Sequence, residues 1–528
     1  MPIRIERDRS SGGYSPGSGR GRGGGGGGGS LIQFIPMLIG LFGRNPKMLI
    51  LLVVGGAIWY FVGGKGCASM TSDTPAETTE GSFSMGADFD EKKYSATEIY
   101  EPLADNKRNP MPEAVSLLKY APQPMNQGQQ GSCVAWASAY AARSIMEARE
   151  SGSNPQSTRF SPAFLYNQIA LQGCQGAYLP EAMKVMKGAG LAPYEDMQYS
   201  DQDCSQKPSD MALRNASEFK IEGYQRLTLG DDPKSVDILA IKQNIAQGAP
   251  VVIGMMVGGS FMKDMVGKET WIPVESDFSM SGFGGHAMCV IGYDDYKFGN
   301  HGGFQIMNSW GQEWGNKGVA WIPYDIFVGG DFVKEAYGLY PMGNADAPKT
   351  NTLEIELGIV LNESDANVSL GNGSSSAAFI TSSKMKKGEK GGDRFKIMVA
   401  NNLECYVYIF GQETSGSSYV LFPYTKKHSP FCGITGTRLF PSDHSLYPDD
   451  VGTVDYFAVL ISQSVIDYDA FSQQISASAG STLAEKLQRA IGNNAVNTNW
   501  QPGNSLKGSC SWQKGGKGMT GAVIEVMK

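Results

Sequence analysis

The chain has few cysteines, no net positive charge, no repeats and no metal-ligand spacing at His428 or His444, and each of these absences excludes a class of protein. Eight cysteines in 528 residues are too few for a disulfide scaffold, although one or two bridges fit an oxidising compartment. The formal net charge of -7 argues against a nucleic-acid-binding protein. We find no repeat of solenoid type. His428 and His444 stand in polar loops without metal-ligand spacing, so we predict no metal and no organic cofactor.

The chain is longer than one core of about 100 to 200 residues requires, so two folded domains with extensions are expected. Residues 1–30 contain several arginines, a run of glycines and almost no apolar side chains. Such a segment cannot bury a core. We therefore expect a disordered basic Gly-rich tail.

Residues 31–64 form an expected membrane-associated segment. Residues 48–64 are uncharged and flanked by Lys47 and Lys65, which predicts a transmembrane helix at the short limit for crossing a bilayer. A cleaved signal peptide and a buried helix are the alternatives. Residues 31–43 are also apolar but contain Pro36, which favours an interfacial or re-entrant segment, with a tight helical hairpin as the competing interpretation.

The charges around this segment predict its orientation. Seven Arg or Lys residues precede residue 48, whereas Lys65 is the only one in the first 25 positions after residue 64. The positive-inside rule then predicts a single-pass protein with a cytoplasmic N-terminus and its folded part in the periplasm or outside the cell. Residues 65–110, rich in Thr, Ser and acidic side chains at first, are interpreted as a tether.

A reactive thiol is predicted at Cys133. A Gly-rich turn at 126–131 leads directly into an Ala-rich stretch, which predicts a helix whose first residue is Cys133 and whose N-cap is Ser132. Unpaired N–H groups and the positive end of a helix stabilise a thiolate there. The small Gly131 and Ser132 leave room for a substrate backbone.

A histidine and an asparagine follow on two expected neighbouring strands. His286 opens an apolar run after a glycine pair, and Asn308 ends the next run, with an Asp- and Gly-rich connection at 294–303. An antiparallel pair would bring the two side chains together. The amide oxygen of Asn308 would then hold the imidazole in the tautomer that faces Cys133.

These segments resemble the papain family of cysteine peptidases. Residues 126–137 look like its nucleophile motif, and Asn308-Ser309-Trp310-Gly311 matches its Asn-Ser-Trp-Gly run. The resemblance implies an α+β, two-lobed papain-like fold over 111–341, with a helical half at about 127–235 and a β-barrel-like half. It also implies that Gln127 is an oxyanion donor. The substrate-binding residues that it implies are Gly176, Ala177, Gly285 and Trp310.

The chain departs from the family pattern at one disulfide. The family usually carries a cysteine where this chain has Gln130, so Cys174 must find another partner. The family often has a bridge ending near Cys204, which makes Cys174–Cys204 the candidate pair, and two free thiols are the alternative. Nothing in 65–110 resembles the helical inhibitory propeptide of the family, so the resemblance does not predict how activity is controlled.

A second domain is expected after a linker at 342–351. Residues 352–528 contain six strand-like runs between Gly/Ser-rich turns, at 353–361, 395–400, 405–410, 419–422, 456–461 and 522–527. Two helices are expected at 467–475 and 483–491. The pattern favours a β-sandwich, and it weakly resembles a small domain of unknown function appended to some bacterial peptidases, with a partner in the cell envelope as one role.

The sequence therefore predicts a membrane-anchored, papain-like cysteine peptidase. Its partners would be a peptide or protein substrate and, through 48–64, the lipid bilayer. Two alternatives stay open. One is a catalytically inactive papain-fold binding module of the cell envelope, and the other is a thiol acyltransferase that uses the same covalent intermediate with an amine acceptor.

Overall fold

The computed structural model describes residues 3–7, 83–340, 351–361, 370–372, 379–513 and 515–528. All of them belong to one compact unit of the chain. The expected membrane-associated segment at 31–64 lies outside the described residues, so the transmembrane helix at 48–64 stays a prediction. Within the described ranges, no helix combines the length and the apolar character that crossing a bilayer requires.

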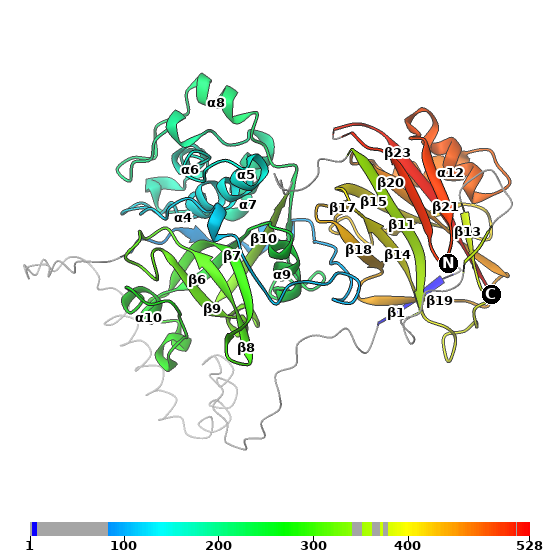
Figure 1. The fold of residues 1–528 in the computed structure, drawn as a ribbon, viewed down its shortest axis with the longest axis horizontal. Coiled ribbons are helices and arrows are strands. Elements are labelled where there is room, and N and C mark those ends of the chain that lie inside the picture. The colour runs from blue at the N-terminus through cyan, green and yellow to red at the C-terminus, as the bar shows by residue number, and fades with distance from the viewer. Residues whose placement is uncertain (1–2, 8–82, 341–350, 362–369, 373–378, 514) are drawn as a thin grey trace, which may run out of the picture. The chain divides into compact units, whose positions relative to one another are not determined.

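The region expected to be a peptidase, called the peptidase region below, begins with a mainly helical half (Figure 1). One continuous helical stretch starts at Cys133 and consists of α4 (Cys133–Ala135), the π-helix η4 (Trp136–Arg143) and α5 (Ser144–Ser151). Side-chain caps fix the starts of several other helices. The capped helices are α3 (Glu91–Ser95), α6 (Pro162–Ile169), α8 (Asp210–Ala216) and α9 (Ile238–Ala246). Helices α7 (Leu179–Gly188) and α10 (Gly259–Lys263) begin without a side-chain cap.

The second half is an antiparallel sheet with the strand order β5-β10-β6-β7-β8-β9, and β3 pairs with β7. The strands are β3 (Ala114–Ser116), β5 (Gly223–Arg226), β6 (Val251–Val257), β7 (Gly284–Phe298), β8 (His301–Met307), β9 (Val319–Pro323) and β10 (Val333–Tyr340). Among the described residues, β5 and β9 are the edge strands of this sheet.

Short 3-10 helices and one small strand pair complete the region. The 3-10 helices are η3 (Leu118–Tyr120), η5 (Gln172–Cys174), η6 (Tyr194–Asp196), η7 (Glu275–Ser279) and η8 (Tyr324–Phe327). The small pair joins β2 (Ala87–Asp88) to β4 (Ala177–Tyr178) in parallel. In Figure 1, helices α4 to α8 gather on one side and strands β6 to β9 on the other.

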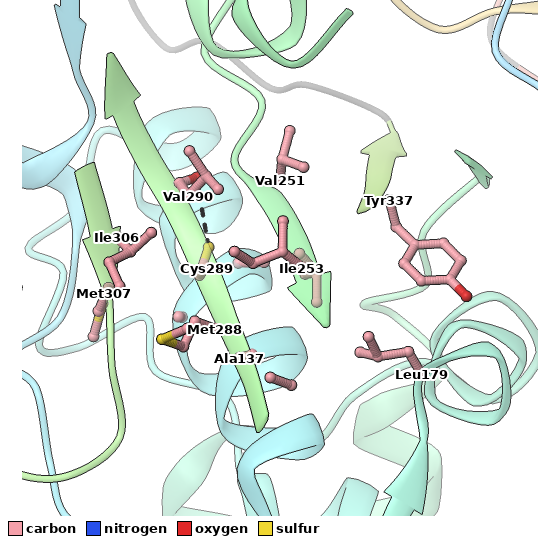
Figure 2. Close-up of a cluster of buried hydrophobic side chains, with 14 of the residues drawn as sticks. Ala137, Leu179, Val251, Ile253, Met288, Cys289, Val290, Ile306, Met307 and Tyr337 are labelled. Atoms are coloured by element: carbon pink, nitrogen blue, oxygen red, sulfur yellow. Dashed lines mark hydrogen bonds between the residues drawn. The ribbon is translucent and has the colours of Figure 1, made fainter. Parts of the chain in front are cut away.

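The core of the peptidase region lies between the helix η4 and the sheet. Figure 2 shows Ala137 of η4 near Met288 of β7, with Ile306 of β8 and Ile253 of β6 on either side of that strand. All four side chains are buried. Strand β6 contacts the helices η4 and α9, and it is apolar along its whole length rather than alternating. This packing fixes β7 and the helix start on which Cys133 lies.

The C-terminal domain consists of two sheets and two helices. One sheet has the order β1-β19-β14-β11-β22-β21 with β18 beside β14, and the other has the order β12-β13-β23-β20-β15-β16 with β17 beside β15. The bounds are β11 (Thr352–Leu361), β12 (Leu370–Asn372), β13 (Phe379–Ser382), β14 (Phe395–Asn401), β15 (Cys405–Gln412), β16 (Ser418–Phe422), β17 (Phe431–Cys432), β18 (Gly436–Phe440), β19 (His444–Pro448), β20 (Val454–Ser462), α11 (Tyr468–Ala477), α12 (Leu483–Ile491), η9 (Gly492–Asn494), β21 (Thr498–Pro502), β22 (Leu506–Ser511) and β23 (Met519–Met527). All six expected strands and both expected helices are present.

Alternating side chains on β15 explain how these layers pack. Val407 and Ile409 point into a buried cluster shared with Leu357 of the other sheet, as in a β-sandwich. Tyr408 and Phe410 point the opposite way and pack with residues of α11 and α12. The two helices therefore cover the outer face of one sheet.

Two parts of the N-terminal region differ from the sequence-based expectation. Residues 83–110 are not a free tether, because Tyr94, Tyr100 and Leu103 are buried in the core cluster of the peptidase region. Within the tail that composition predicts to be disordered, β1 (Ile3–Arg7) pairs antiparallel with β19. Residues 8–30 lie outside the described residues.

Candidate functional site

Cys133 is the first residue of α4 and is completely buried. Its Sγ accepts a hydrogen bond of 3.4 Å from the backbone N–H of Ala287, the residue after His286 on β7. Ser132 occupies the expected N-cap position, but its side chain makes no bond to the helix amides. The predicted helix start is therefore correct, whereas the predicted capping by Ser132 is wrong.

His286 and Asn308 lie side by side, as expected from the pairing of β7 with β8. Nε2 of His286 is 2.7 Å from Oδ1 of Asn308, and the N–H of Ser309 donates to the same oxygen at 2.7 Å. An oxygen that accepts cannot also donate, so Nε2 carries the proton and Nδ1 holds a lone pair. Nδ1 is buried and has no partner among the described residues, which leaves it available as a base. The Trp310 ring stacks on the imidazole with centroids 4.4 Å apart.

Burial keeps both reactive groups neutral in this structure. It raises the pKa of the Cys133 thiol to about 12, although the backbone N–H groups of Ala287, Val134 and Cys133 oppose the rise. Burial also lowers the pKa of His286 to about 4, against the effect of its hydrogen bond with Asn308. The thiolate expected from the helix start is therefore not the favoured form while the site is covered.

Gln127 is buried beside the nucleophile and its amide is oriented from both ends. Its Oε1 accepts from Ser309 Oγ at 2.6 Å, and its Nε2 donates to the carbonyl oxygen of Gln130 at 2.9 Å. The carbonyl oxygen of Gln130 can only accept, so the end of the amide that faces it is the nitrogen. One of the two Nε2 protons is engaged in this way, and the second is available to a ligand.

The substrate-binding residues expected from the resemblance are covered by the chain itself. We call residues 83–89 the covering segment. The N–H of Gly86 donates to the carbonyl oxygen of Gly285 at 3.1 Å, and the N–H of Ala177 donates to that of Gly86 at 2.8 Å. Trp310 Nε1 donates to the carbonyl oxygen of Ser84 at 2.8 Å. The parallel pairing of β2 with β4 continues this contact, with Ala177 opposite Ala87.

Apolar side chains hold the covering segment on both sides of Gly86. The Phe83 ring stacks on Trp310 with centroids 4.7 Å apart and planes within 10°. Phe89 lies so close to Gly254 that a Cβ on this glycine would overlap with its ring. Gly86 in turn lies against the backbone of Gly131, where no side chain fits. The space that Gly131 leaves open is therefore filled.

The loop beyond the substrate wall is joined by the candidate disulfide. Cys174 and Cys204 are bonded, with Cα atoms 5.9 Å apart. Gln130, which stands where the family usually has a cysteine, is buried, and its backbone carbonyl serves Gln127 and Ser132.

Sequence reasoning missed three features of this site. The covering segment alternates Phe83, Met85, Ala87 and Phe89, a period-two pattern that marks an extended strand. Ser309 was noted only as part of a motif. Tyr199, whose hydroxyl lies 2.8 Å from the carbonyl oxygen of Gln127, gave no local signal.

The structure thus brings together a cysteine at a helix start, a histidine held by an asparagine and an oriented glutamine, in the arrangement that the resemblance implies. Residues 115–327 match the model of the papain family cysteine proteases.

The sequence is also similar to those of individual proteins. An uncharacterized peptidase C1-like protein of Acanthamoeba polyphaga mimivirus is 30% identical over 215 residues, which are 39% of this chain and 66% of that protein. Cathepsin K of Mus musculus is 27% identical over 234 residues, 43% of this chain and 64% of the relative. The chain thus spans slightly less than two thirds of the length of these curated relatives. Among solved structures, xylellain, a cysteine protease from Xylella fastidiosa, is 26% identical, with coverage of 49% of this chain and 96% of that one and a TM-score of 0.40.

Proposed function

We propose that this chain is a cysteine peptidase that hydrolyses peptide bonds through Cys133 and is attached to a membrane by its N-terminal region. One observation carries the catalytic part of the proposal. The Sγ of Cys133 is hydrogen-bonded to the N–H next to His286, and Asn308 leaves Nδ1 of this histidine free. Nucleophile and base are therefore held on two rigid elements, α4 and β7.

The first half of the reaction forms a thioester. His286 takes the thiol proton through Nδ1, and the Cys133 sulfur attacks the carbonyl carbon of the scissile peptide bond. The imidazolium then gives this proton to the leaving amine as the carbon–nitrogen bond breaks. Asn308 holds the ring during both transfers because its oxygen accepts from Nε2.

Gln127 stabilises the charge that develops on the carbonyl oxygen. Its free Nε2 proton and the backbone N–H of Cys133 are the donors, and Ser309 keeps the amide in the orientation that presents nitrogen. Loss of one such donor lowers turnover by about 100-fold to 1,000-fold in comparable sites. In the second half of the reaction, His286 removes a proton from water, the hydroxide attacks the thioester, and the thiol is regenerated with release of the acid.

The covering segment makes the described form latent. Gly86 occupies the backbone donor and acceptor positions at Gly285 and Ala177 that a substrate would use. Phe83 lies on Trp310, which shields His286. A peptide therefore reaches Cys133 only after residues 83–89 have moved away.

The C-terminal domain anchors the chain just beyond the covering segment. The N–H of Ile99 donates to the carbonyl oxygen of Lys427 at 2.7 Å, and the N–H of Ser429 donates to that of Ile99 at 3.0 Å. Asn109 donates to and accepts from the backbone of Thr437. We assign to this domain the role of holding residues 97–109, and with them the covering segment, in place.

The membrane attachment rests on the uncharged run at 48–64 and on the basic residues before it. A single crossing places the N-terminus in the cytoplasm and the peptidase outside. The pairing of β1 with β19 requires both strands to be on the same side of the membrane. This favours a helical hairpin formed by residues 31–64 rather than a single crossing. Labelling of a cysteine introduced at Ser10 by a membrane-impermeant reagent in intact cells supports the hairpin, and labelling only after lysis supports the single crossing.

Peptide hydrolysis tests the catalytic proposal. The full chain and its Cys133→Ala and Cys289→Ala variants are incubated with a peptide mixture, before and after limited proteolysis that removes the covering segment. Cys289 is an equally buried cysteine of the same domain, so it is the matched control. After the covering segment is removed, we expect new amino termini in the peptide mixture with the parent and Cys289→Ala and none with Cys133→Ala. Products that appear only with an added amine would indicate the acyltransferase. The absence of any product would indicate the inactive binding module.

A further inference from the structure

Tyr199 touches the site from outside the helix and the two motif strands. It lies five residues before Cys204, is partly buried, and packs edge-on against Trp136 with ring centroids 4.9 Å apart. Its hydroxyl is 2.8 Å from the carbonyl oxygen of Gln127 and 2.6 Å from Oγ of Ser132. One phenol thus joins the residue before the nucleophile to the oxyanion glutamine.

The direction of both hydrogen bonds follows from counting protons. A carbonyl oxygen only accepts, so the single phenolic proton of Tyr199 goes to Gln127. Ser132 Oγ must then be the donor in the second bond. The pKa of Tyr199 is raised to about 12 by burial, so the phenol keeps this proton at neutral pH. The bond to Tyr199 therefore uses the Ser132 proton and fixes the direction in which the hydroxyl points.

The placement of this hydroxyl at Tyr199 goes together with the missing cap by Ser132. A serine at the N-cap normally accepts from the N–H of the second or third helical residue, here Val134 or Ala135. Tyr199 draws the hydroxyl away, and no such bond forms. The N–H groups of Cys133 and Val134 stay directed at the Cys133 sulfur, whose negative form they favour.

We propose that Tyr199 is a positioning residue: its hydroxyl keeps Ser132 from capping the helix, so that the Val134 N–H serves the Cys133 sulfur. The other hydrogen bond of this hydroxyl, to the carbonyl oxygen of Gln127, holds the turn that carries the oxyanion amide. The inference rests on the thiol mechanism proposed above, because it assigns this N–H group to that chemistry.

The loop that carries Tyr199 is itself braced against the same turn. Asp201 Oδ2 accepts from the N–H of Gln129 at 3.1 Å. The disulfide from Cys204 leads to Cys174, whose carbonyl oxygen accepts from the N–H of Gly131 at 3.1 Å. Contacts on both sides of Tyr199 therefore fix its distance from Ser132.

The test compares Tyr199→Phe with Tyr199→Phe/Ser132→Ala in the full chain carrying Gly86→Val, which displaces the covering segment. Tyr293→Phe is the control, because its hydroxyl also donates to a backbone carbonyl, that of Pro112 at 2.7 Å, away from the site. Values of kcat and KM are measured with a peptide, and the rate of Cys133 alkylation by iodoacetamide is measured against pH.

We expect Tyr199→Phe to lower kcat about tenfold with KM within about twofold, since a cap by Ser132 takes the Val134 N–H away from the Cys133 sulfur. The midpoint of the alkylation profile should move to higher pH. Removing the freed hydroxyl with Ser132→Ala should reverse most of the loss in kcat and most of the shift in the alkylation midpoint. A merely structural defect would not be reversed by a second substitution. The proposal is overturned if Tyr199→Phe behaves like Tyr293→Phe, or if the double variant recovers nothing.

The two readouts separate this proposal from the peptidase itself. If the Gly86→Val parent hydrolyses no peptide, the proposed function fails, and the alkylation profiles alone decide the role of Tyr199. An unshifted midpoint in Tyr199→Phe then refutes the positioning role, and a shift that Ser132→Ala reverses supports it.

Discussion

The backbone N–H of Gly86 donates a 3.1 Å hydrogen bond to the carbonyl oxygen of Gly285, the residue before His286. On its other side, Gly86 lies against the backbone of Gly131, two residues before Cys133. A single glycine thus spans the gap between the element that carries the nucleophile and the one that carries the base. The latency of the site depends on this position having no side chain.

Gly86→Val should therefore activate the chain. Its Cβ would overlap with the carbonyl oxygen of Gly131, so the covering segment cannot stay in place. A clash of about 1.4 kcal/mol already raises the open fraction about tenfold. Initial rates of peptide hydrolysis measure the effect. Gly188→Val is the control, since a Cβ at Gly188 meets nothing within 4 Å. Equal rates for all three proteins would show that residues 83–89 do not limit access.

The pH dependence of thiol alkylation should differ between the closed and the opened chain. In the closed chain burial raises the pKa of Cys133 to about 12 and lowers that of His286 to about 4, so the neutral pair prevails at pH 7. Alkylation of the parent should thus rise steadily into the alkaline range. Gly86→Val exposes the pair to water, and its profile should reach a plateau at lower pH. Superimposable profiles would contradict the link between covering and ionisation.

Asn308→Ala should lower turnover without abolishing alkylation of Cys133. The imidazole loses the acceptor that holds Nε2, so proton transfer to the leaving amine becomes misaligned, with an expected loss of about tenfold to 100-fold in kcat. The thiol itself is unchanged. The measurement is kcat in the Gly86→Val background, with the surface residue Asn402→Ala as control. Unaltered kcat would mean that another group orients His286.

Glu101 should make stability depend on pH. Burial raises its pKa from 4.5 to about 8, although Ser442 and Arg438 oppose the rise. The folded chain therefore binds a proton that the unfolded chain has lost. The stabilisation is complete below about pH 4.5, declines by about 1.4 kcal/mol per pH unit, and is gone above about pH 8. Buried Glu335, with a pKa also raised to about 8, acts in the same direction.

Glu101→Gln separates these two contributions. The amide keeps the size of the neutral acid but does not ionise, so the difference in unfolding free energy between parent and variant should shift in favour of the variant from pH 5 to pH 8. Denaturant titrations at several pH values measure it. Parallel curves would show that Glu101 is ionised in the folded chain.

The reactive centre was predictable because its chemistry is written in short local segments. The turn before Cys133, the glycine pair before His286 and the run after Asn308 each specify a local structure, and strand pairing brings two of them together. The C-terminal strands and helices were predictable for the same reason, since their alternation and turns are local.

The features that were missed depend on contacts between distant residues. The covering segment is extended and short, and its place is decided by glycines at 131, 254 and 285 that lie far away in the sequence. Ser132 has the local preference of an N-cap, but a tyrosine 67 residues away overrides it. The free tether was wrong because Tyr94 and Tyr100 find their partners in the peptidase core.

Labelling with an epoxysuccinyl inhibitor tests most directly that Cys133 is the nucleophile of a site closed by residues 83–89. Intact mass and peptide mapping identify the labelled residue in the parent, Gly86→Val and Cys133→Ala chains. We predict one adduct, on Cys133, which forms at least about tenfold faster in Gly86→Val than in the parent and not at all in Cys133→Ala. An adduct on another cysteine, or none on the opened chain, would contradict the account.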